Sequence, residues 1–326
     1  MEIDVNVYHI IDHEGYGTIH QLLIPLCERY KNHFLLARYF DENYLSGLNV
    51  SKINNDKNCI IIIHSTGKIN TYIMNNFYKL FPNKKIYIFF HTSFEYQKFK
   101  KRDKNITFYK SIENNFKTAF LVPSLEVYLQ YKKAGLKNIK VVQLGIDAIE
   151  KNNKYRDFRK DLSIYYNKVI TTCSSENKDY LYIKGIDKYA YFIQNNNLYD
   201  MALIAGIENN PYDNILSKKF DLDDFLNVLY HSKAYVQFSK YESYNITAIQ
   251  AKRFKLATFL QKAEGNNTCM NGITYKNFDE TESSIIKYLK NNQLYGDVIK
   301  KLYIDSLQRE SLEQFKMSIE NLERND

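Results

Sequence analysis

The stretch FSKYESYNITAIQAKRFKLATFLQKAEG, residues Phe238 to Gly265, predicts the fold around it. It begins at the end of an apolar strand, AYVQF, crosses a polar loop that contains Glu242, and continues into a helix with apolar residues at helical spacing. A second short strand, Leu256 to Leu260, follows. In an open parallel sheet, ligands bind beyond the carboxyl ends of the strands, next to helix N-termini. Glu242 is therefore expected where a ligand would bind.

This stretch resembles the E-x7-E region of the retaining nucleotide-sugar glycosyltransferases of glycosyltransferase family 4. The matching positions are Ser239, Glu242, an aromatic residue at Tyr244, Ile246, Ala248, Ile249 and Ala251. Two positions depart from the family pattern. Gln250 stands where the family has its second glutamate, and Asn245 replaces the loop glycine.

The composition suits a globular protein with two domains. The chain has 326 residues, of which 44% are hydrophobic and 25% charged, and a length near 150 residues is usual for one domain. Its four cysteines have no CxxC or metal-ligand spacing, which is typical of reduced thiols in a cytosolic protein. Neither an 18-residue apolar run nor a basic N-terminal region occurs, so we expect no membrane span and no signal peptide.

The formal net charge of +8 favours an anionic partner such as a nucleotide or a membrane surface. Between Lys98 and Lys117, basic residues alternate with aromatic ones, a pattern that can dock on anionic lipid headgroups. The simpler interpretation is a solvated face whose aromatic residues turn toward the core. No signature of an RNA-recognition or helix-turn-helix module is present, so we do not expect a nucleic-acid partner.

The first half of the sequence alternates strands with helices. A strand at Ile3 to Ile11 precedes a loop with Gly15 and Gly17, where glycines allow backbone amides to approach a phosphate closely. The resemblance implies that this loop faces the donor. Two apolar runs, Cys59 to His64 and Lys85 to Phe90, are typical of buried parallel strands.

Histidines stand at the ends of both buried runs. His64 ends the first run and His91 directly follows the second, where polar side chains reach a cleft or simply cap the strand. The family usually has a histidine at the position of His91, and the resemblance implies that it contacts the donor sugar or its phosphate.

Two further segments carry the resemblance. AFLVPS, from Ala119, and the later LGID, ending at Asp147, resemble the block that closes the family's N-terminal domain, and the polar segment AIEKNNKYRDFRKD after it reads as a linker. YIKGIDKYAYFI resembles the family's KGID element and places Lys184 before Gly185. An ammonium at Lys184 would stabilise the negative charge that develops on a leaving diphosphate.

Two features of the second half leave alternatives open. Many relatives have an arginine about five residues before the lysine, whereas this chain has Ser174 and Ser175 there, and Lys178 is an uncertain substitute. The DxD pattern Asp221-Leu222-Asp223 resembles a metal site. We interpret it as helix capping with first-turn carboxylates, because the residues after it have helical periodicity.

The resemblance implies an α/β protein with the GT-B fold, in which two Rossmann-like, doubly wound domains face each other across a cleft. The expected domains are an acceptor-binding domain at 1–150 and a nucleotide-sugar-binding domain at 151–305. A C-terminal helix at 306–326 would pack back on the N-terminal domain.

The implied activity is that of a hexosyltransferase that moves a sugar from a UDP- or GDP-linked donor to an acceptor hydroxyl, with retention of configuration. Neither a cofactor nor a metal is expected, because lysine, loop amides and a helix dipole would hold the diphosphate. Acceptors would be glycans or lipid-linked or protein-linked sugars. The implied catalytic residues are His91, Lys184 and Glu242, and the implied donor-binding residues are Gly15, Gly17, Ser239, Tyr244, Asn245, Ile246 and Gln250.

Within this set, Glu242 would hold sugar hydroxyls, Gln250 would face the ribose, and amides near Tyr244 to Ile246 would meet the phosphates. By analogy, the setting is the cytoplasm, at the inner face of the membrane, in bacterial surface polysaccharide, glycolipid or glycoprotein synthesis. A module that binds a sugar nucleotide or a partner without catalysis is the main alternative, given the departures from the pattern. A nucleotide-sugar 2-epimerase is a second one, while the lack of GxGxxG after a strand argues against a dinucleotide enzyme.

Overall fold

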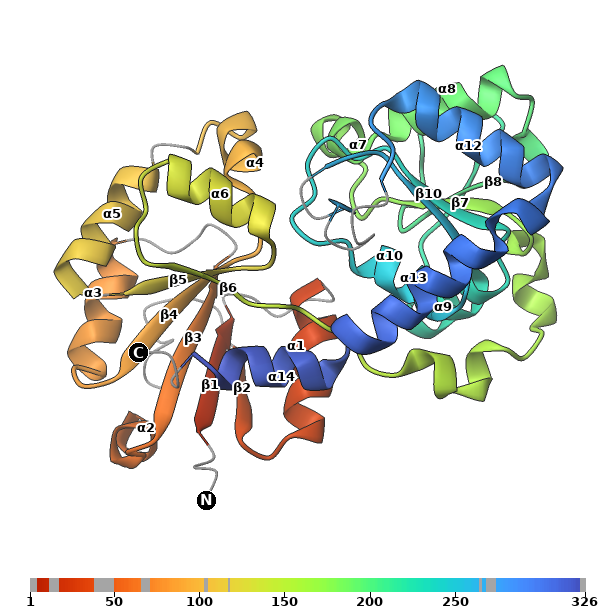
Figure 1. The fold of residues 1–326 in the computed structure, drawn as a ribbon. Helices are drawn as coiled ribbons and strands as arrows, with labels where there is room; N and C mark the ends of the chain where they lie inside the picture. Colours follow the sequence, from red (N-terminus) through yellow and green to blue (C-terminus); the bar gives the residue numbers. More distant parts are fainter. Residues whose placement is uncertain are drawn as a thin grey trace. The chain divides into compact units, whose positions relative to one another are not determined.

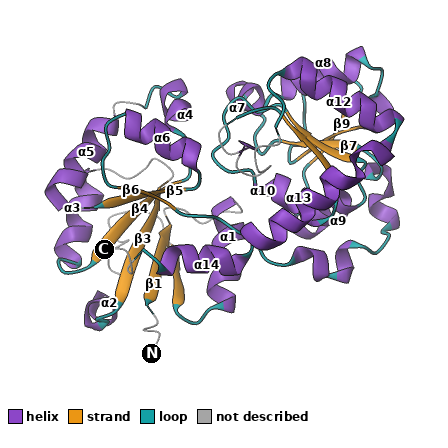
Figure 2. Ribbon diagram, in the orientation of Figure 1, coloured by secondary structure: helices purple, strands orange, loops and turns teal. Residues whose placement is uncertain are grey.

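The computed structural model describes residues 5–11, 18–37, 50–65, 71–102, 105–116, 118–263, 266–267 and 274–322. Gly15, Gly17 and Gly265 lie outside the described residues. The chain forms two compact units, one of Met1–Asp147 with Leu312–Asp326 and one of Ala148–Ser311 (Figure 1). Each unit is a parallel sheet with helices on both faces, which confirms the α/β class predicted from the sequence (Figure 2).

The first unit contains six described strands in the order β2-β1-β3-β4-β5-β6. Neighbouring strands pair in parallel. Their bounds are β1 (Asn6–Ile11), β2 (His33–Ala37), β3 (Cys59–Ser65), β4 (Lys85–Phe90), β5 (Ala119–Val122) and β6 (Ile139–Val141). Continuous runs such as CIIIIH and KIYIFF form the central strands, because both of their faces are buried.

Helices cover both faces of this sheet. The helices are α1 (Thr18–Arg29), α2 (Val50–Asn55), α3 (Thr71–Leu80), α4 (Phe94–Phe99), α5 (Asn105–Phe116), α6 (Leu125–Lys133) and α14 (Leu312–Glu320). One core packs Ile61, Ile63 and Phe90 of the sheet against α2, α3, α5 and α6. Helices α1 and α14 lie on the opposite face (Figure 1).

The last helix of the chain, α14, is part of the first unit. It buries Leu312, Phe315 and Ile319. Its Ser318 hydroxyl accepts a hydrogen bond of 3.0 Å from the backbone amide of Gln143, and Glu320 accepts one of 2.7 Å from Asn32. The first unit is therefore assembled from two stretches that are far apart in the sequence.

The second unit contains five described strands in the order β11-β10-β7-β8-β9. They are β7 (Val169–Thr172), β8 (Ala202–Ala205), β9 (Leu216–Lys218), β10 (Ala234–Gln237) and β11 (Ala257–Leu260). The helices are α7 (Lys178–Lys184), α8 (Ile186–Asn195), α9 (Leu222–Tyr230), α10 (Ile246–Arg253), α12 (Phe278–Lys290) and α13 (Gly296–Arg309). From β7 the chain adds β8 and β9 on one side and then returns to add β10 and β11 on the other, so its topological switch point lies between β7 and β10.

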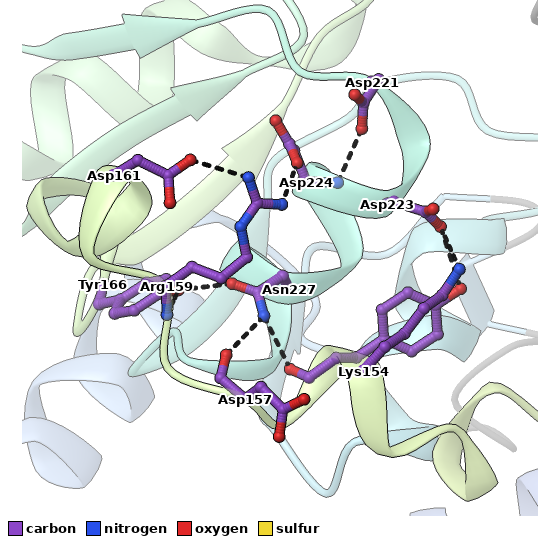
Figure 3. A network of polar contacts seen from close by, with 10 residues as sticks. Lys154, Asp157, Arg159, Asp161, Tyr166, Asp221, Asp223, Asp224 and Asn227 are labelled. Atoms are coloured by element: carbon purple, nitrogen blue, oxygen red, sulfur yellow. Dashed lines mark hydrogen bonds and ion pairs between the residues drawn. The ribbon is translucent and has the colours of Figure 1, made fainter.

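The polar segment after Asp147 is folded and packs on α9. It forms three short 3-10 helices, Ile149–Lys151, Asn153–Tyr155 and Lys160–Tyr165. Lys154 and Arg159 pair with Asp223 and Asp224, and Asn227 donates hydrogen bonds to the carbonyls of Tyr155 and Asp157 (Figure 3). The expectation of a plain linker missed these contacts, because each partner lies about 70 residues away in the sequence.

The DxD pattern has the helix-capping role predicted for it. Asp221 is the N-cap of α9, and its side chain accepts a hydrogen bond of 2.8 Å from the amide of Asp224 (Figure 3). Asp223 and Asp224 stand in the first turn, where carboxylates compensate the helix dipole. Both carboxylates are engaged with basic side chains of the preceding segment.

The basic stretch from Lys98 to Lys117 spans α4 and α5, with residues 103, 104 and 117 outside the described residues. Tyr109 is buried and Phe108 packs against the core of the first unit, so these two rings face inward. Among the described helices, none combines the length and the apolar character needed to cross a membrane.

Candidate functional site

The loops that follow β7 and β10 meet at the switch point of the second sheet. The loop after β10 runs from Phe238 to Asn245 and leads into α10, and the loop after β7 leads into α7. A short helix, α7, ends at Lys184, and α8 begins directly after Gly185. Crevices at such switch points are where parallel α/β sheets bind ligands.

Gly185 holds the end of α7 against the end of β10. Its backbone has φ 68°, in the left-handed region. A Cβ atom at this position would lie 2.2 Å from the carbonyl oxygen of Phe238. The amide of Lys240 also donates a hydrogen bond of 2.8 Å to the carbonyl of Ile183. Only glycine allows this backbone approach, which brings Lys184 next to the loop that carries Glu242.

Lys184 and Glu242 form an ion pair at this junction. The Nζ atom of Lys184 lies 2.6 Å from Oε2 of Glu242, and the two side chains are 18% and 10% exposed. Burial disfavours the ammonium, but the Glu242 carboxylate, with smaller contributions from Tyr180 and Tyr235, outweighs it and raises the pKa of Lys184. The structure therefore joins two of the predicted site residues, and Lys184 is charged at neutral pH.

A polar network adjoins this pair at the carboxyl ends of β7 and β10. The hydroxyl of Tyr235 lies 3.1 Å from Oγ1 of Thr172 and donates a hydrogen bond of 2.7 Å to Gln237. Asn245 donates to Gln237 and also to Asn266, the latter at 2.8 Å. Burial raises the pKa of Tyr235, so its hydroxyl stays protonated and donates. This network fixes the start of the loop that carries Glu242.

Asn245 has a structural role that its predicted donor-binding role did not include. It is the N-cap of α10, and its Oδ1 accepts a hydrogen bond of 3.0 Å from the amide of Ala248. Its φ of −99° is an ordinary value, so the backbone at this position does not need the family's glycine. The side chain thus satisfies one amide of the first helical turn and links α10 to β10.

The other predicted donor-binding residues of this stretch are almost fully buried. Tyr244, Ile246 and Gln250 are each buried at the start of α10 or on it. Ser239 is also buried, and its Oγ atom has no hydrogen-bond partner among the residues that the structure describes. A buried hydroxyl without a partner is uncommon in folded proteins.

Buried ion pairs anchor the far end of α10. Lys252 Nζ lies 2.6 Å from Oε2 of Glu310, the C-cap residue of α13, and both side chains are buried. Arg253 pairs with Glu150 at 3.2 Å and donates a hydrogen bond of 2.8 Å to the carbonyl of Ser306. Burial raises the pKa of Glu310 despite the attraction of Lys252. Helix α10 is thus held at both ends.

His91 belongs to the first unit and ends a line of hydrogen-bonded imidazoles that we call the histidine row: His33, His9, His64 and His91. Neighbouring strands β2, β1 and β3 supply the first three, and His91 follows β4. The ring nitrogens lie 3.0 Å apart between His33 and His9, 3.0 Å between His9 and His64, and 2.8 Å between His64 and His91. Phe89 stacks on His91 with ring centroids 4.5 Å apart.

The row decides between the two interpretations that the sequence leaves open for His64. This side chain is fully buried and bonds through both ring nitrogens to other histidines, so it cannot reach a cleft at the strand end. His9 and His33 were not singled out from the sequence, because each sits inside an apolar strand. Within the described residues, no cluster of histidine, cysteine or acidic side chains is arranged to hold a metal ion.

Sequence reasoning also missed Tyr235, Gln237 and Thr172. They lie inside short apolar strands, so no motif marks them. Tyr235 and Gln237 are two residues apart in AYVQF and thus on one face of β10, and a glutamine within an apolar strand is the signal that could have identified the network.

Comparison with known proteins places the fold. Neither a protein-family model nor a curated protein sequence matches the chain. Among solved structures, HepE from Anabaena in complex with UDP aligns with a TM-score of 0.73 at 12% identity, covering 99% of this chain and 100% of that one. Sucrose-phosphate synthase from Thermosynechococcus elongatus gives 0.71 at 11%, covering 98% of each chain. A glycosyltransferase from Rickettsia africae gives 0.68 at 13%, covering 99% and 100%. The chain therefore has the GT-B fold.

Proposed function

We propose that this protein is a retaining glycosyltransferase that moves a sugar from a nucleotide-diphosphate donor to an acceptor hydroxyl, and that the second unit binds the donor. The ion pair between Lys184 and Glu242 is the observation that carries this proposal. It lies where the loops after β7 and β10 meet, beside the start of α10. HepE, one of the proteins similar in fold, has also been crystallised with UDP-glucose.

The chemistry follows from the charges at this junction. Without a donor, the ammonium of Lys184 is neutralised by Glu242. A diphosphate can replace the carboxylate as the partner of Lys184, and Glu242 is then available to accept hydrogen bonds from sugar hydroxyls. As the bond between the sugar and the phosphate breaks, negative charge moves to the diphosphate, and the nearby ammonium stabilises it. The dipole of α10 adds to this effect, and we propose that neither a metal nor another cofactor takes part.

Other residues complete the proposed donor site. Ser239 and the amides of Tyr244 and Ile246 would meet the phosphates, and Gln250 would face the ribose. The acceptors we propose are a glycan or a lipid- or protein-linked sugar, in bacterial surface-polysaccharide, glycolipid or glycoprotein synthesis at the cytoplasmic face of the membrane.

The test is turnover of a panel of UDP- and GDP-sugars, measured as released nucleoside diphosphate. We expect Lys184→Met to lower turnover on the order of 10²–10³-fold, as removal of a charge-stabilising donor usually does. The control is Lys218→Met, which removes another lysine of the second unit, one paired with Glu208 at the exposed surface. It should leave turnover unchanged.

A binding module without catalysis is the second candidate, and it is favoured by Gln250 in place of the family's second glutamate and by Ser174 and Ser175 in place of its arginine. Calorimetry with UDP and GDP separates the two functions. Binding that Lys184→Met weakens, without turnover of any donor, would support the binding module. Background turnover that is equal in wild type and Lys184→Met, together with no nucleotide binding, would refute both.

A further inference from the structure

The histidine row has only two hydrogen-bonding states when its rings are neutral. A neutral imidazole carries one N–H and one lone pair, so each contact between two rings needs one proton. If His91 donates from Nε2, then His64 accepts at Nδ1 and must donate from its own Nε2, and the same holds along the row. Either all four rings carry the proton on Nε2, or all four carry it on Nδ1.

Burial keeps three rings of the row, His33, His9 and His64, neutral. Desolvation lowers the pKa of His9 and His64 well below the ordinary value, and neighbouring histidines lower it further. Burial lowers the pKa of His33 to about 4, although Glu320 partly opposes this shift. At neutral pH His9, His33 and His64 therefore each have one proton to share, which is the condition for the two-state behaviour along these three rings.

Glu320 on α14 distinguishes the two states. Its Oε1 lies 3.8 Å from Nε2 of His33, a buried nitrogen with no hydrogen bond to the described residues. Asn32 and Lys316 hold the two carboxylate oxygens at 2.7 and 3.0 Å. A proton on His33 Nε2 points toward this acceptor, whereas a lone pair there would face the oxygen lone pairs. The carboxylate thus favours the state with every proton on Nε2.

Three other charged or titratable groups lie around this end, and among them the charge of Lys316 also lowers the pKa of His33. Tyr30, which follows α1, donates its hydroxyl proton to Glu313 of α14. Lys316 lies over the Tyr30 ring at 5.3 Å while it pairs with Glu320. At the opposite end, Phe89 of β4 stacks on both His64 and His91 and carries no charge.

We propose that Glu320 sets the tautomer of His91 through the three histidines between them. His91 then carries its proton on Nε2 and its lone pair on Nδ1. Glu320, His33, His9 and His64 are positioning residues that act through His91. This inference holds whether or not the protein transfers a sugar, because it concerns the proton positions of the first unit alone.

The experiment is two-bond proton–nitrogen correlation spectroscopy on the full chain labelled with ¹⁵N-histidine, which assigns the protonated nitrogen of each ring. In the wild type we expect all four rings of the row to be protonated on Nε2. In Glu320→Ala we expect the Nδ1-protonated fraction to rise in all four rings together. Glu313→Ala, the neighbouring carboxylate of α14, should leave the row unchanged.

A second experiment interrupts the hydrogen bonds of the row at His9. In a His9→Phe background, Glu320→Ala should no longer alter the tautomer of His91. Wild-type rings protonated on Nδ1, or a His91 that does not respond to Glu320→Ala in the intact row, would overturn the proposal. The spectrum of the wild type alone shows whether the rings are protonated on Nε2 or on Nδ1.

Discussion

Gly185 shows how a single residue sets the geometry of the proposed site. Its left-handed backbone and its approach to the Phe238 carbonyl place Lys184 beside Glu242. The KGID element can be recognised in the sequence, but the reason for its glycine cannot. The carbonyl that Gly185 contacts belongs to Phe238, 53 positions further along the chain. This reason is a close approach between two backbones, and only the fold reveals it.

Replacement of Gly185 by alanine should lower the free energy of unfolding and weaken donor binding. The left-handed backbone alone costs a non-glycine residue about 1–2 kcal/mol, and the new Cβ must also displace the Phe238 carbonyl. Thermal unfolding and nucleotide calorimetry measure the two effects. The matched control is Gly296→Ala at the start of α13, where φ is −55° and a Cβ would meet nothing within 4 Å. An equal, small effect of both substitutions would contradict this account.

Gln250 is the second residue that can be tested alone. If it faces the ribose, as we propose, Gln250→Glu should tighten nucleotide binding by roughly tenfold. A carboxylate accepts from both ribose hydroxyls, and a charged hydrogen bond contributes about 1 kcal/mol more than a neutral one. Calorimetry with UDP or GDP measures the change. Unaltered or weaker binding would argue against contact between this position and the ribose.

The elements could be predicted well where apolar runs are continuous. Strand β4 has the predicted bounds Lys85–Phe90, and α10 lies between two strands as the stretch from Phe238 to Gly265 indicates. The 3-10 helices after Asp147 could not be predicted, because they have no hydrophobic periodicity and depend on pairs with α9. Likewise, the helical spacing of apolar residues that predicts α10 does not indicate the buried ion pair that anchors the end of this helix to α13.

The ion pair between Lys252 and Glu310 gives a prediction about how α10 is held in the second unit. Lys252→Met should destabilise the second unit by about 3–5 kcal/mol, because it leaves the Glu310 carboxylate buried without its partner. The double replacement Lys252→Met with Glu310→Leu should recover most of this loss. Urea denaturation measures both. Lys154→Met, which breaks the exposed pair with Asp223, is the control and should cost about 1 kcal/mol or less. Similar costs for Lys252→Met and Lys154→Met would show that burial of the first pair is unimportant.

At the scale of the whole molecule, the histidine row makes the first unit sensitive to acid. The folded pKa values of His9, His33 and His64 lie below the ordinary value near 6.5, so below pH 6.5 the unfolded chain binds more protons than the folded one. The free energy of unfolding should therefore fall as the pH drops from about 6.5 toward 4. Each of these histidines contributes up to about 1.4 kcal/mol per pH unit.

Hydrogen exchange of β1 and β3 amides, corrected for the intrinsic pH dependence of exchange, measures this slope in the first unit. His33→Gln should reduce this slope by up to about 1.4 kcal/mol per pH unit, which corresponds to one bound proton. His231→Gln, in the second unit, should not change the slope. A slope that His33→Gln leaves intact would show that this histidine is not held neutral by the fold.

The overall fold was largely accessible from the sequence, because alternating strands and helices indicate an α/β protein and the resemblance of its motifs implies two doubly wound domains. The histidine row was not, because its members come from separate strands and meet only when β2, β1, β3 and β4 are placed side by side. Strand order is a property of long-range pairing, and no local pattern in the sequence encodes it.

The position of α14 has a consequence for how the protein is made. The ribosome completes residues 148–311 before it reaches this helix, so the first sheet must wait for its final covering while the second unit is already available to fold. Until then, the surface that receives Phe315 and Ile319 is open to chaperones or to aggregation. A fragment that ends at Asp147 lacks this covering, and a stable isolated first domain would have to be produced with residues 312–322 joined to it.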